Sequence, residues 1–384
     1  MKKVVVLGAT GSIGSSSLAI IKQFPDEFSL LGVSAHSKVD KVASIATEHS
    51  PEIVVLGDES LVPVFRERCP LFRGEVLTGE EGLCQLAASA GADLVIAGIV
   101  GVAGLRPVEA ALRAGRRVLL ANKESLVCAG AQLTRLVSSH GGQIIPIDSE
   151  HSAIFQLLEG RGRDDLDELI LTASGGPFWR MSTSELGDVT PEQAVKHPRW
   201  NMGAKISVDS ATLVNKALEL IEAAWLFELP EDRIGIVIHP ESIIHSLVHF
   251  RDGVQFAHLS VPDMRGPIAY GMAYPDRRLE GVMERLRLEK VGTLNFAALD
   301  DARFPAPSLA RQCLRSGGNA AAVFNLINES AVELFLRGAL RFTAIVPLIE
   351  RGIERFFAAA APDVTDILEL SERVHRWAKG EGMR

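Results

Sequence analysis

Two acidic residues, Asp148 and Glu150, flank a serine at the end of the apolar run QIIPI. In an extended strand, residues two apart point to the same side, so both carboxylates would face one cation. Hard oxygen ligands without a nearby histidine or cysteine pattern favour Mg²⁺ or Mn²⁺ over zinc. Taken alone, the D-x-E motif is common and is better explained by a solvated strand end that carries two ordinary acids.

A second polar cluster lies on a predicted helix that opens near Asp209 and Ser210, either of which could cap its free N–H groups. Asn215 and Glu219 share one face of this helix, about 6 Å apart along its axis, and Lys216 flanks them. Glu219 would complete the metal site. Ser210, Asn215 and Lys216 would hold a phosphate group. An amphipathic helix with an ordinary Lys/Glu pair explains the spacing equally well.

A glycine-rich turn near the N-terminus indicates a dinucleotide site. The apolar run VVVLG leads into Gly8, Gly11 and Gly14, spaced as G-x-x-G-x-x-G, and then into the helical stretch SSSLAIIKQF. Glycine lets the backbone approach a pyrophosphate, whose charge meets the free N–H groups at the start of the helix. A turn with a purely structural role is the alternative.

The end of the second expected strand favours NADP over NAD. A site for NAD usually places Asp or Glu there, to bind the ribose 2′-hydroxyl. This chain has none in the stretch Ser34 to Lys38, and Ser37 and Lys38 would suit a 2′-phosphate. Ordinary solvated loop residues are the alternative interpretation.

Three further loops place polar or bulky residues beside the expected site. ANKES, with Lys123 and Glu124, follows the apolar run RVLL, and ligands of doubly wound sheets collect at such carboxyl ends. TASGGP holds Ser174 in a turn of small residues whose N–H groups could bind an anion. HPRWNMG carries Trp200 and Met202 and is typical of a lid. A surface ion pair, a plain turn and a loop packed on the core are the respective alternatives.

The composition excludes several classes of protein. The chain has 384 residues, 47% of them hydrophobic and 23% charged, a size that predicts two or three domains. A net charge of -8 without a broad basic face argues against nucleic acid as a partner. No apolar run approaches the roughly 20 residues that span a bilayer, so no membrane partner is expected. Four scattered cysteines without a CxxC pair indicate a reducing compartment, the cytoplasm.

The pattern of apolar runs predicts an α/β protein with three parts. Residues 1–149 alternate strand-like and helical stretches, with VVVLG, FSLLGVSA, EIVVLG, ADLVIAG, RVLLAN and QIIPID as strands of a Rossmann-like, doubly wound parallel sheet. Residues 150–275 are expected to form a central α+β catalytic domain, with a flap at 196–204. Residues 276–299 have little periodicity and are expected to be a linker, whereas 300–384 predict a small helical domain.

Six segments of the chain resemble, in order, the signature segments of the 1-deoxy-D-xylulose 5-phosphate reductoisomerase family: GATGSIG, ANKESLV, IDSEHSAIFQ, LTASGGPF, HPRWNMGAKISVDSATLVNKALELIEA and VIHPESIIHS. The later stretch FNLINESAVELFL is similar to the family as well. The resemblance implies a homodimer of V-shaped protomers that converts 1-deoxy-D-xylulose 5-phosphate to 2-C-methyl-D-erythritol 4-phosphate, with NADPH and Mg²⁺ or Mn²⁺. This reaction is a committed step of isoprenoid precursor synthesis.

The resemblance also implies roles for individual residues. The implied metal ligands are Asp148, Glu150 and Glu219, and the implied catalytic residues are Lys123, Glu150 and His197. The implied substrate contacts are Lys123, Ser149, Glu150, Ser174, His197, Ser210, Asn215, Lys216 and Glu219, beneath a flap that carries Trp200 and Met202. The implied cofactor contacts are Thr10, Gly11, Ser12, Ile13, Asn122, Glu124 and Gly203. The glycine-rich turn adds Gly8 to them, and the loop after the second expected strand adds Ser37 and Lys38.

Several relatives carry Gly-Lys-Asn where this chain has His36, Ser37 and Lys38. How this chain holds the 2′-phosphate therefore does not follow from the resemblance. Two alternative functions remain. A semialdehyde dehydrogenase would share the nucleotide turn but would need a catalytic cysteine, for which Cys128 near the ANKES loop is the candidate. A non-enzymatic NADP sensor would need only the N-terminal domain.

Overall fold

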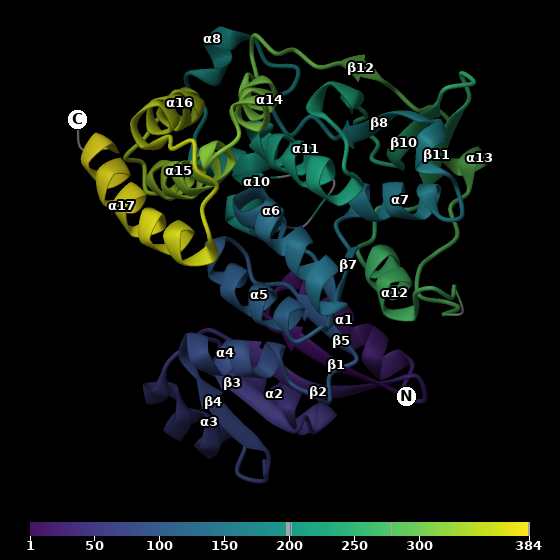
Figure 1. Ribbon diagram of the computed structural model, residues 1–384, viewed down its shortest axis with the longest axis vertical. Helices are drawn as coiled ribbons and strands as arrows, with labels where there is room; N and C mark the ends of the chain where they lie inside the picture. The colour runs from purple at the N-terminus through teal and green to yellow at the C-terminus, as the bar shows by residue number, and fades with distance from the viewer. Residues whose placement is uncertain (197–199, 201, 278, 383–384) are drawn as a thin grey trace. The chain divides into compact units, whose positions relative to one another are not determined.

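The computed structural model describes residues 1–196, 200, 202–277 and 279–382 (Figure 1). Its internal contacts divide the chain into two compact units. The first comprises Met1–Ser125, Gln132–Ser152 and Asp263–Glu284. The second comprises Leu126–Ala131, Ala153–Pro262 and the chain from Arg285 onward.

The first unit is built on a parallel sheet of seven strands in the order β4-β3-β2-β1-β5-β6-β7. The chain winds outward from β1 in both directions, so the order reverses between β1 and β5. In such sheets a crevice opens at this reversal, at the carboxyl ends of the strands, and binds nucleotides. The strands are β1 (Lys2–Leu7), β2 (Phe28–Ala35), β3 (Ile53–Leu56), β4 (Glu75–Thr78), β5 (Leu94–Ala97), β6 (Arg117–Leu120) and β7 (Gln143–Pro146).

Helices cover the sheet because its strands are apolar on both sides. Val4, Val5 and Val6 in β1 are fully buried, as expected for a central parallel strand. On one face, side chains of α1, α2, α3 and α12 share a core with the sheet. The helices of this unit are α1 (Ser12–Gln23), α2 (Val39–His49), α3 (Val62–Arg68), α4 (Gly79–Ala87), α5 (Leu105–Arg113) and α12 (Arg265–Ala273), together with both ends of α6 (Lys123–His140), whose residues Leu126–Ala131 belong to the second unit.

The predicted Rossmann-like sheet is confirmed, with one strand more than the six expected. The additional strand, β4, has only four residues, EVLT, and none of them is fully buried. So short a run at the edge of a sheet lacks the continuous apolar pattern that revealed the other strands.

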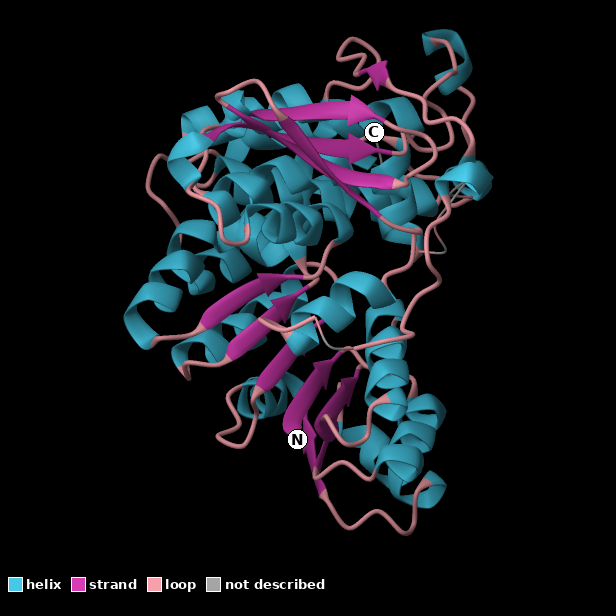
Figure 2. Ribbon diagram, turned by 90° about the vertical axis from the view of Figure 1, so that its right-hand side faces the viewer, coloured by secondary structure: helices cyan, strands magenta, loops and turns pink. Residues whose placement is uncertain are grey.

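The second unit contains a mixed sheet of five strands in the order β11-β10-β8-β9-β12 (Figure 2). β8 and β9 are parallel, whereas β10 runs antiparallel to both β8 and β11. Leu169 and Leu171 of β8 and Val248 of β10 form a core with Leu220 and Phe227 of α11. The strands are β8 (Leu166–Ala173), β9 (Ile234–Ile238), β10 (Ile244–Phe250), β11 (Gln255–Leu259) and β12 (Ala297–Ala298).

The C-terminal part of the second unit is helical, as predicted. Helix α15 is buried along most of its length and contacts α14, α16 and α17. The helices of this unit are α8 (Thr183–Leu186), α9 (Pro191–Ala194), α10 (Ala204–Ala211), α11 (Val214–Phe227), α13 (Leu288–Val291), α14 (Ala306–Ser316), α15 (Ala320–Leu336), α16 (Ile345–Phe356) and α17 (Val364–Gly382), and α7 (Ser149–Leu158) spans the boundary between the units. None of the helices in the described part of the chain has the length and apolar character of a membrane span.

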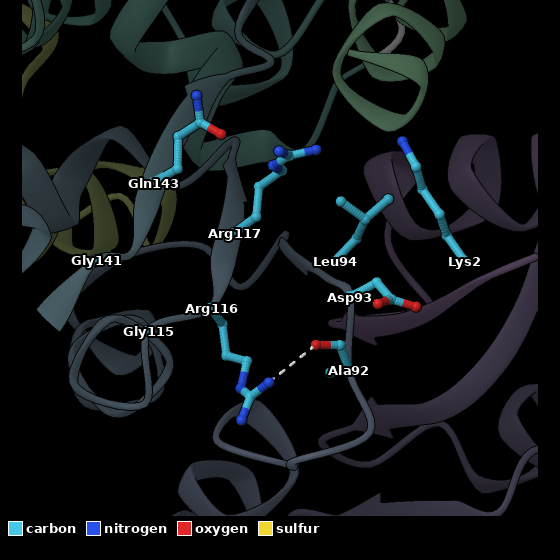
Figure 3. Close-up of a pocket in the computed structure, with 9 residues that line it drawn as sticks. All are labelled: Lys2, Ala92, Asp93, Leu94, Gly115, Arg116, Arg117, Gly141 and Gln143. Carbon is cyan, nitrogen blue, oxygen red and sulfur yellow. Dashed lines mark hydrogen bonds between the residues drawn. The ribbon is translucent and has the colours of Figure 1, made fainter. Parts of the chain in front are cut away.

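A hollow of about 380 Å³ lies at the amino ends of the strands in the first unit (Figure 3). Its cations are engaged with backbone carbonyls: the Lys2 ammonium donates to Met272 O, and the Arg117 guanidinium donates to Tyr274 O. Nucleotides bind at the opposite, carboxyl edge of such a sheet. The hollow is therefore not a candidate for the dinucleotide site.

Replacing Gly14 by Ala should destabilise the first unit. An added Cβ would lie 2.5 Å from the Ala9 Cα, so α1 would have to move away from the turn. Overpacking of this kind costs about 1–3 kcal/mol. The measurement is the free energy of unfolding in urea. Gly380→Ala in α17 is the matched control, because its Cβ would meet no atom within 4 Å. Equal stabilities of Gly14→Ala and the wild type would contradict the prediction.

Candidate active site

The turn between β1 and α1 packs closely against the end of β2 and the segment that follows β5. Gly8 has a φ of +78°, and a Cβ there would lie 2.9 Å from Gly98 O, beyond the end of β5. The Gly8 N–H donates to Ser34 Oγ at 2.9 Å, which ties the turn to β2. Gly11 precedes α1 and has no side chain with which to cap it. The first N–H groups of α1, which no side chain caps, therefore suit a pyrophosphate.

The loop after β2 has the character expected of an NADP site. His36, Ser37 and Lys38 are exposed and follow Ala35 directly. The first acid beyond them, Asp40, forms an ion pair with Arg68 at 3.0 Å. In the described stretch from Ser34 to Lys38, the end of β2 and the start of its loop thus carry no carboxylate that could bind a ribose 2′-hydroxyl.

Asn122 organises the loop that follows β6. Its side-chain amide donates to Ile99 O at 2.5 Å and to Gly101 O at 3.0 Å, both in the loop after β5. Its Oδ1 accepts a hydrogen bond from the Ser125 N–H and caps α6. Asn122 and Glu124 are both buried. The loops after β5 and β6 are thereby held together at the carboxyl edge of the sheet.

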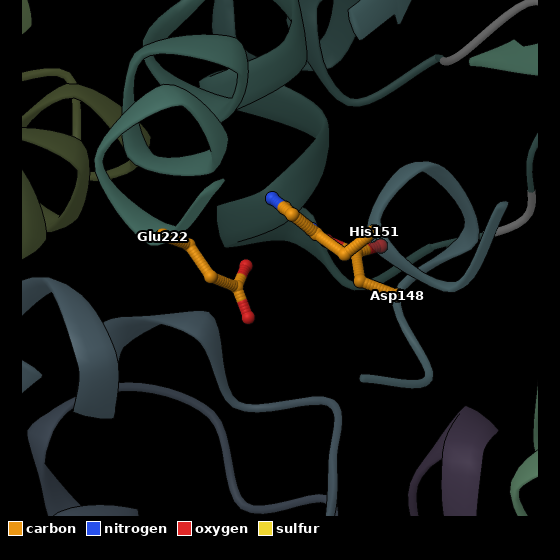
Figure 4. Close-up of side chains that lie close together, drawn as sticks. All are labelled: Asp148, His151 and Glu222. Atoms are coloured by element: carbon orange, nitrogen blue, oxygen red, sulfur yellow. The ribbon is translucent and has the colours of Figure 1, made fainter. Parts of the chain in front are cut away.

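Lys123 and Asp148 meet at the same edge. Their Nζ and Oδ2 atoms lie 2.5 Å apart. His151 lies beside Asp148 (Figure 4), and its Nδ1 is 3.8 Å from the same carboxylate oxygen. Burial raises the pKa of the Asp148 carboxyl, but Lys123 and His151 lower it by more. The pKa is held well below its usual range, so Asp148 is ionised at neutral pH and can serve as a metal ligand.

The expectation that Asp148 and Glu150 alternate along a strand was wrong. Strand β7 ends at Pro146, and α7 begins at Ser149, so Glu150 lies in the first turn of a helix. The Asp148 carbonyl accepts the Ser152 N–H at 2.8 Å, and this bond opens the helix. The two carboxylates still approach each other, with oxygen atoms within 4.8 Å. Two such hard oxygen donors suit Mg²⁺ or Mn²⁺.

Ser210 does not open the helix that carries the second polar cluster, contrary to the prediction. Asp209 and Ser210 lie in the last turn of α10, and α11 begins only at Val214. Between the two helices, Leu213 takes a left-handed conformation with a φ of +57°. A non-glycine residue in this conformation is strained and is typical of functional sites.

The junction of α10 and α11 gathers the residues expected to hold a phosphate. Lys216 donates to Glu219, and Asn215 donates to the same carboxylate at 2.5 Å. Lys216 and Glu219 are almost completely buried. Ser174 Oγ accepts the Gly176 N–H at 3.2 Å, and a Cβ on Gly176 would lie 2.6 Å from Ser210 O. The turn that carries Ser174 therefore packs directly against the end of α10.

A buried network that the sequence analysis missed supports α10. The Asp209 carboxylate is 1% exposed and accepts from Lys205 at 2.8 Å and from Asn328 of α15 at 2.9 Å. Asn325, also on α15, is fully buried and donates to Glu329 at 2.9 Å. Two asparagines within a largely apolar helix were the available signal, because buried amides need polar partners.

The remaining expected residues have varied surroundings. Trp200 and Met202 are partly buried, and Gly203 is exposed and caps α10. His197 lies outside the described residues. Cys128, the thiol that a semialdehyde dehydrogenase would need, is buried and lies 3.4 Å from the Asn325 amide.

Three family models together match most of the chain. The model described as 1-deoxy-D-xylulose 5-phosphate reductoisomerase matches residues 4–130. Those described as the 1-deoxy-D-xylulose 5-phosphate reductoisomerase C-terminal domain and the DXP reductoisomerase C-terminal domain match residues 144–227 and 259–377.

Whole proteins agree with these models. The 1-deoxy-D-xylulose 5-phosphate reductoisomerases of Chlorobium chlorochromatii and Laribacter hongkongensis are each 45% identical to this chain, over 99% and 98% of its length and 98% of theirs. The Zymomonas mobilis enzyme, solved in complex with NADPH, has a TM-score of 0.93 at 39% identity, covering 100% of this chain and 99% of that one. A DOX-P reductoisomerase solved with NADPH, fosmidomycin and magnesium has a TM-score of 0.94 at 39% identity, covering 100% and 98%.

The cysteines of the native protein should react slowly with iodoacetamide at pH 8. Cys69, Cys128 and Cys313 are buried, and Cys84 is half-buried. Burial raises the pKa of Cys313 to about 12, so very little of it is the reactive thiolate. Burial also raises the pKa of Cys84. Mass spectrometry would count the modified thiols, with the urea-unfolded protein as the control that reacts at all four. Rapid modification of Cys128 in the native protein would contradict the prediction that burial protects this thiol.

Proposed function

The chain belongs to the 1-deoxy-D-xylulose 5-phosphate reductoisomerase family, and on that premise we propose how its own residues carry out the reaction. It is an NADPH- and divalent-metal-dependent enzyme that converts 1-deoxy-D-xylulose 5-phosphate to 2-C-methyl-D-erythritol 4-phosphate, in isoprenoid precursor synthesis. The residue assignments rest mainly on the ion pair between Lys123 and Asp148. This pair lies at the carboxyl edge of the same sheet that bears the dinucleotide turn.

NADPH is proposed to lie along the carboxyl edge of the first sheet. The backbone of the β1–α1 turn would hold its pyrophosphate, and the loop after β6 would border the nicotinamide. Support comes from the start of α1, where no side chain caps the N–H groups, and from the bonds that Asn122 makes to the loop after β5. The proposed contacts are Gly8, Thr10, Gly11, Ser12, Ile13, Ser37, Lys38, Asn122, Glu124 and Gly203.

The metal is proposed to bind to Asp148, Glu150 and Glu219. The depressed pKa of Asp148 and the approach of Glu150 to it support the first two ligands. Glu219 is proposed as the third because it is a buried carboxylate whose charge is balanced by Lys216. When bound, the divalent cation would supply Lewis-acid stabilisation of the substrate oxygens, and NADPH would supply the hydride that reduces the rearranged aldehyde.

The substrate phosphate is proposed to bind at the junction of α10 and α11, to Ser174, Ser210, Asn215 and Lys216, with Ser149 and His197 as further substrate contacts. Remote binding of this kind orients the reacting carbons. Lys123 would donate a hydrogen bond from Nζ to a substrate oxygen, and Glu150 would accept a proton from a substrate hydroxyl, with His197 as the third catalytic residue. Trp200 and Met202 would close over the site and exclude water.

We also propose a role for each part of the chain. Residues 1–149 would bind NADPH, and residues 150–275 would supply catalysis, with a flap at 196–204. Residues 276–299 would link them to the helical part, 300–384. We place the enzyme in the cytoplasm, since its free cysteines suit a reducing compartment.

A homodimer is proposed, with the edge strand β11 at the interface. β11 ends the five-stranded sheet, and Val254, Phe256 and Leu259 at this edge are 46%, 41% and 37% exposed. An exposed edge with apolar side chains invites pairing with another chain. A second copy of the sheet would bury these side chains.

Glu150→Gln should lower turnover by at least about a hundredfold, the scale expected when a group that stabilises developing charge is lost. Affinity for NADPH should stay within about twofold of the wild type, because Glu150 is not among the proposed cofactor contacts. NADPH absorbance decay with substrate measures the first quantity, and calorimetry without substrate measures the second.

Glu67→Gln, an exposed substitution in α3, is the matched control and should retain full activity. Chelator should abolish wild-type turnover, and added Mg²⁺ or Mn²⁺ should restore it. Undiminished turnover of Glu150→Gln in Mg²⁺ would refute the assignment of Glu150 as a ligand.

Leu259→Glu should weaken self-association, because it places a charge in the proposed interface. The molar mass from light scattering should fall from that of two chains towards that of one as the protein is diluted. Leu71→Glu is the matched control, since Leu71 is 82% exposed and lies in the first unit. A wild-type protein that is monomeric at micromolar concentration would contradict the proposed homodimer.

A further inference from the structure

A lysine of α2 reaches from the neighbouring helix to the dinucleotide turn. The Nζ of Lys41 donates to Thr10 O at 2.8 Å and to Ser15 Oγ at 3.1 Å. Thr10 lies inside the glycine-rich turn, and Ser15 lies in the first turn of α1. The contacts are confined to the first unit. Lys41 therefore places a positive charge at the outer side of the turn, next to the loop that follows β2.

The charge of Lys41 is not balanced by an acid within the described part of the chain. Both of its partners there are neutral oxygen atoms, and its neighbour Asp40 is paired with Arg68. An ammonium group has three N–H donors, of which these contacts use two. One donor and a full positive charge remain for an anionic ligand at the exposed end of the side chain.

Lys41 lies where the fold would place the ribose 2′-phosphate of a dinucleotide. In doubly wound sheets, the group at the end of the second strand binds the ribose 2′-hydroxyl of the dinucleotide. A phosphate esterified to that oxygen would lie between the loop after β2 and the β1–α1 turn, the two segments that Lys41 adjoins. We propose that Lys41 binds the 2′-phosphate and is the main determinant of the preference for NADPH over NADH.

This inference rests on the proposed placement of NADPH and deepens it. Ser37 and Lys38 belong to the exposed loop after β2, whereas Lys41 is fixed to a regular helix and already oriented by two hydrogen bonds. An oriented cation loses less conformational freedom on binding than a free one. Lys41 is therefore expected to contribute more to the discrimination than Lys38.

The test is calorimetric binding of 2′,5′-ADP and 5′-ADP to the full-length enzyme without substrate. The two probes differ only in the 2′-phosphate. Lys41→Gln should weaken binding of 2′,5′-ADP by about 10–100-fold, the range for a lost hydrogen bond between charged groups. Binding of 5′-ADP should be unchanged. Lys41→Arg keeps the charge and should restore most of the affinity for 2′,5′-ADP.

Lys22→Gln is the matched control, because Lys22 is an exposed lysine at the far end of α1, paired with Glu48. It should alter the binding of neither probe. Steady-state kinetics provide a second measurement: Lys41→Gln should lower kcat/KM for NADPH and leave that for NADH unchanged.

Three results would overturn the inference. A parallel loss for both probes in Lys41→Gln would mean that Lys41 only holds the turn in place. Unchanged binding of both, with a selective loss in Lys38→Gln, would assign the 2′-phosphate to the loop after β2. A wild-type enzyme that binds the two probes equally would refute NADPH dependence itself, which separates failure of the proposed function from failure of the role of Lys41.

Discussion

The ion pair between Lys123 and Asp148 depends on the parallel pairing of β6 with β7. Leu120 lies opposite Pro146 in that register, so the residues that follow both strands emerge at the same edge of the sheet. Lys123 then opens α6, and Asp148 precedes α7. The ammonium keeps the buried carboxylate ionised, a condition for any hard cation to bind there. Register, charge and metal affinity are thus consequences of one backbone arrangement.

The second unit also holds buried charges, at the junction of α10 and α11. Lys216 and Glu219 are both buried, and two charges can stay there only if each satisfies the other and further polar atoms complete the set. Asn215 supplies one such partner on the same helix. The left-handed Leu213 redirects the chain so that Ser210 and Lys216, on consecutive helices, border one junction. The left-handed conformation of one residue thereby positions polar groups of two helices.

Much of this could be predicted from sequence because the relevant signals are local. The glycine spacing at Gly8 to Gly14 follows from backbone sterics, and apolar β-branched runs identify buried parallel strands. The helix that holds Glu150 was mistaken for a strand because three residues are too few to show a period. The break at Leu213 was missed because no glycine or proline marks it. The contacts of Asn328 with Asp209 and of Lys41 with Thr10 join segments distant in sequence, so spacing alone cannot reveal them.

Helix α12 has a consequence for how the polypeptide is made. Its residues Ile268, Ala269 and Met272 belong to the same core as Val4 and Val6, although more than 250 positions separate them. During synthesis, the sheet that bears the dinucleotide turn is complete after residue 146, but its hydrophobic core stays open until the segment ending at Glu284 leaves the ribosome. The nascent sheet therefore exposes apolar surface until α12 has been synthesised. Chaperones would bind to this surface during that time.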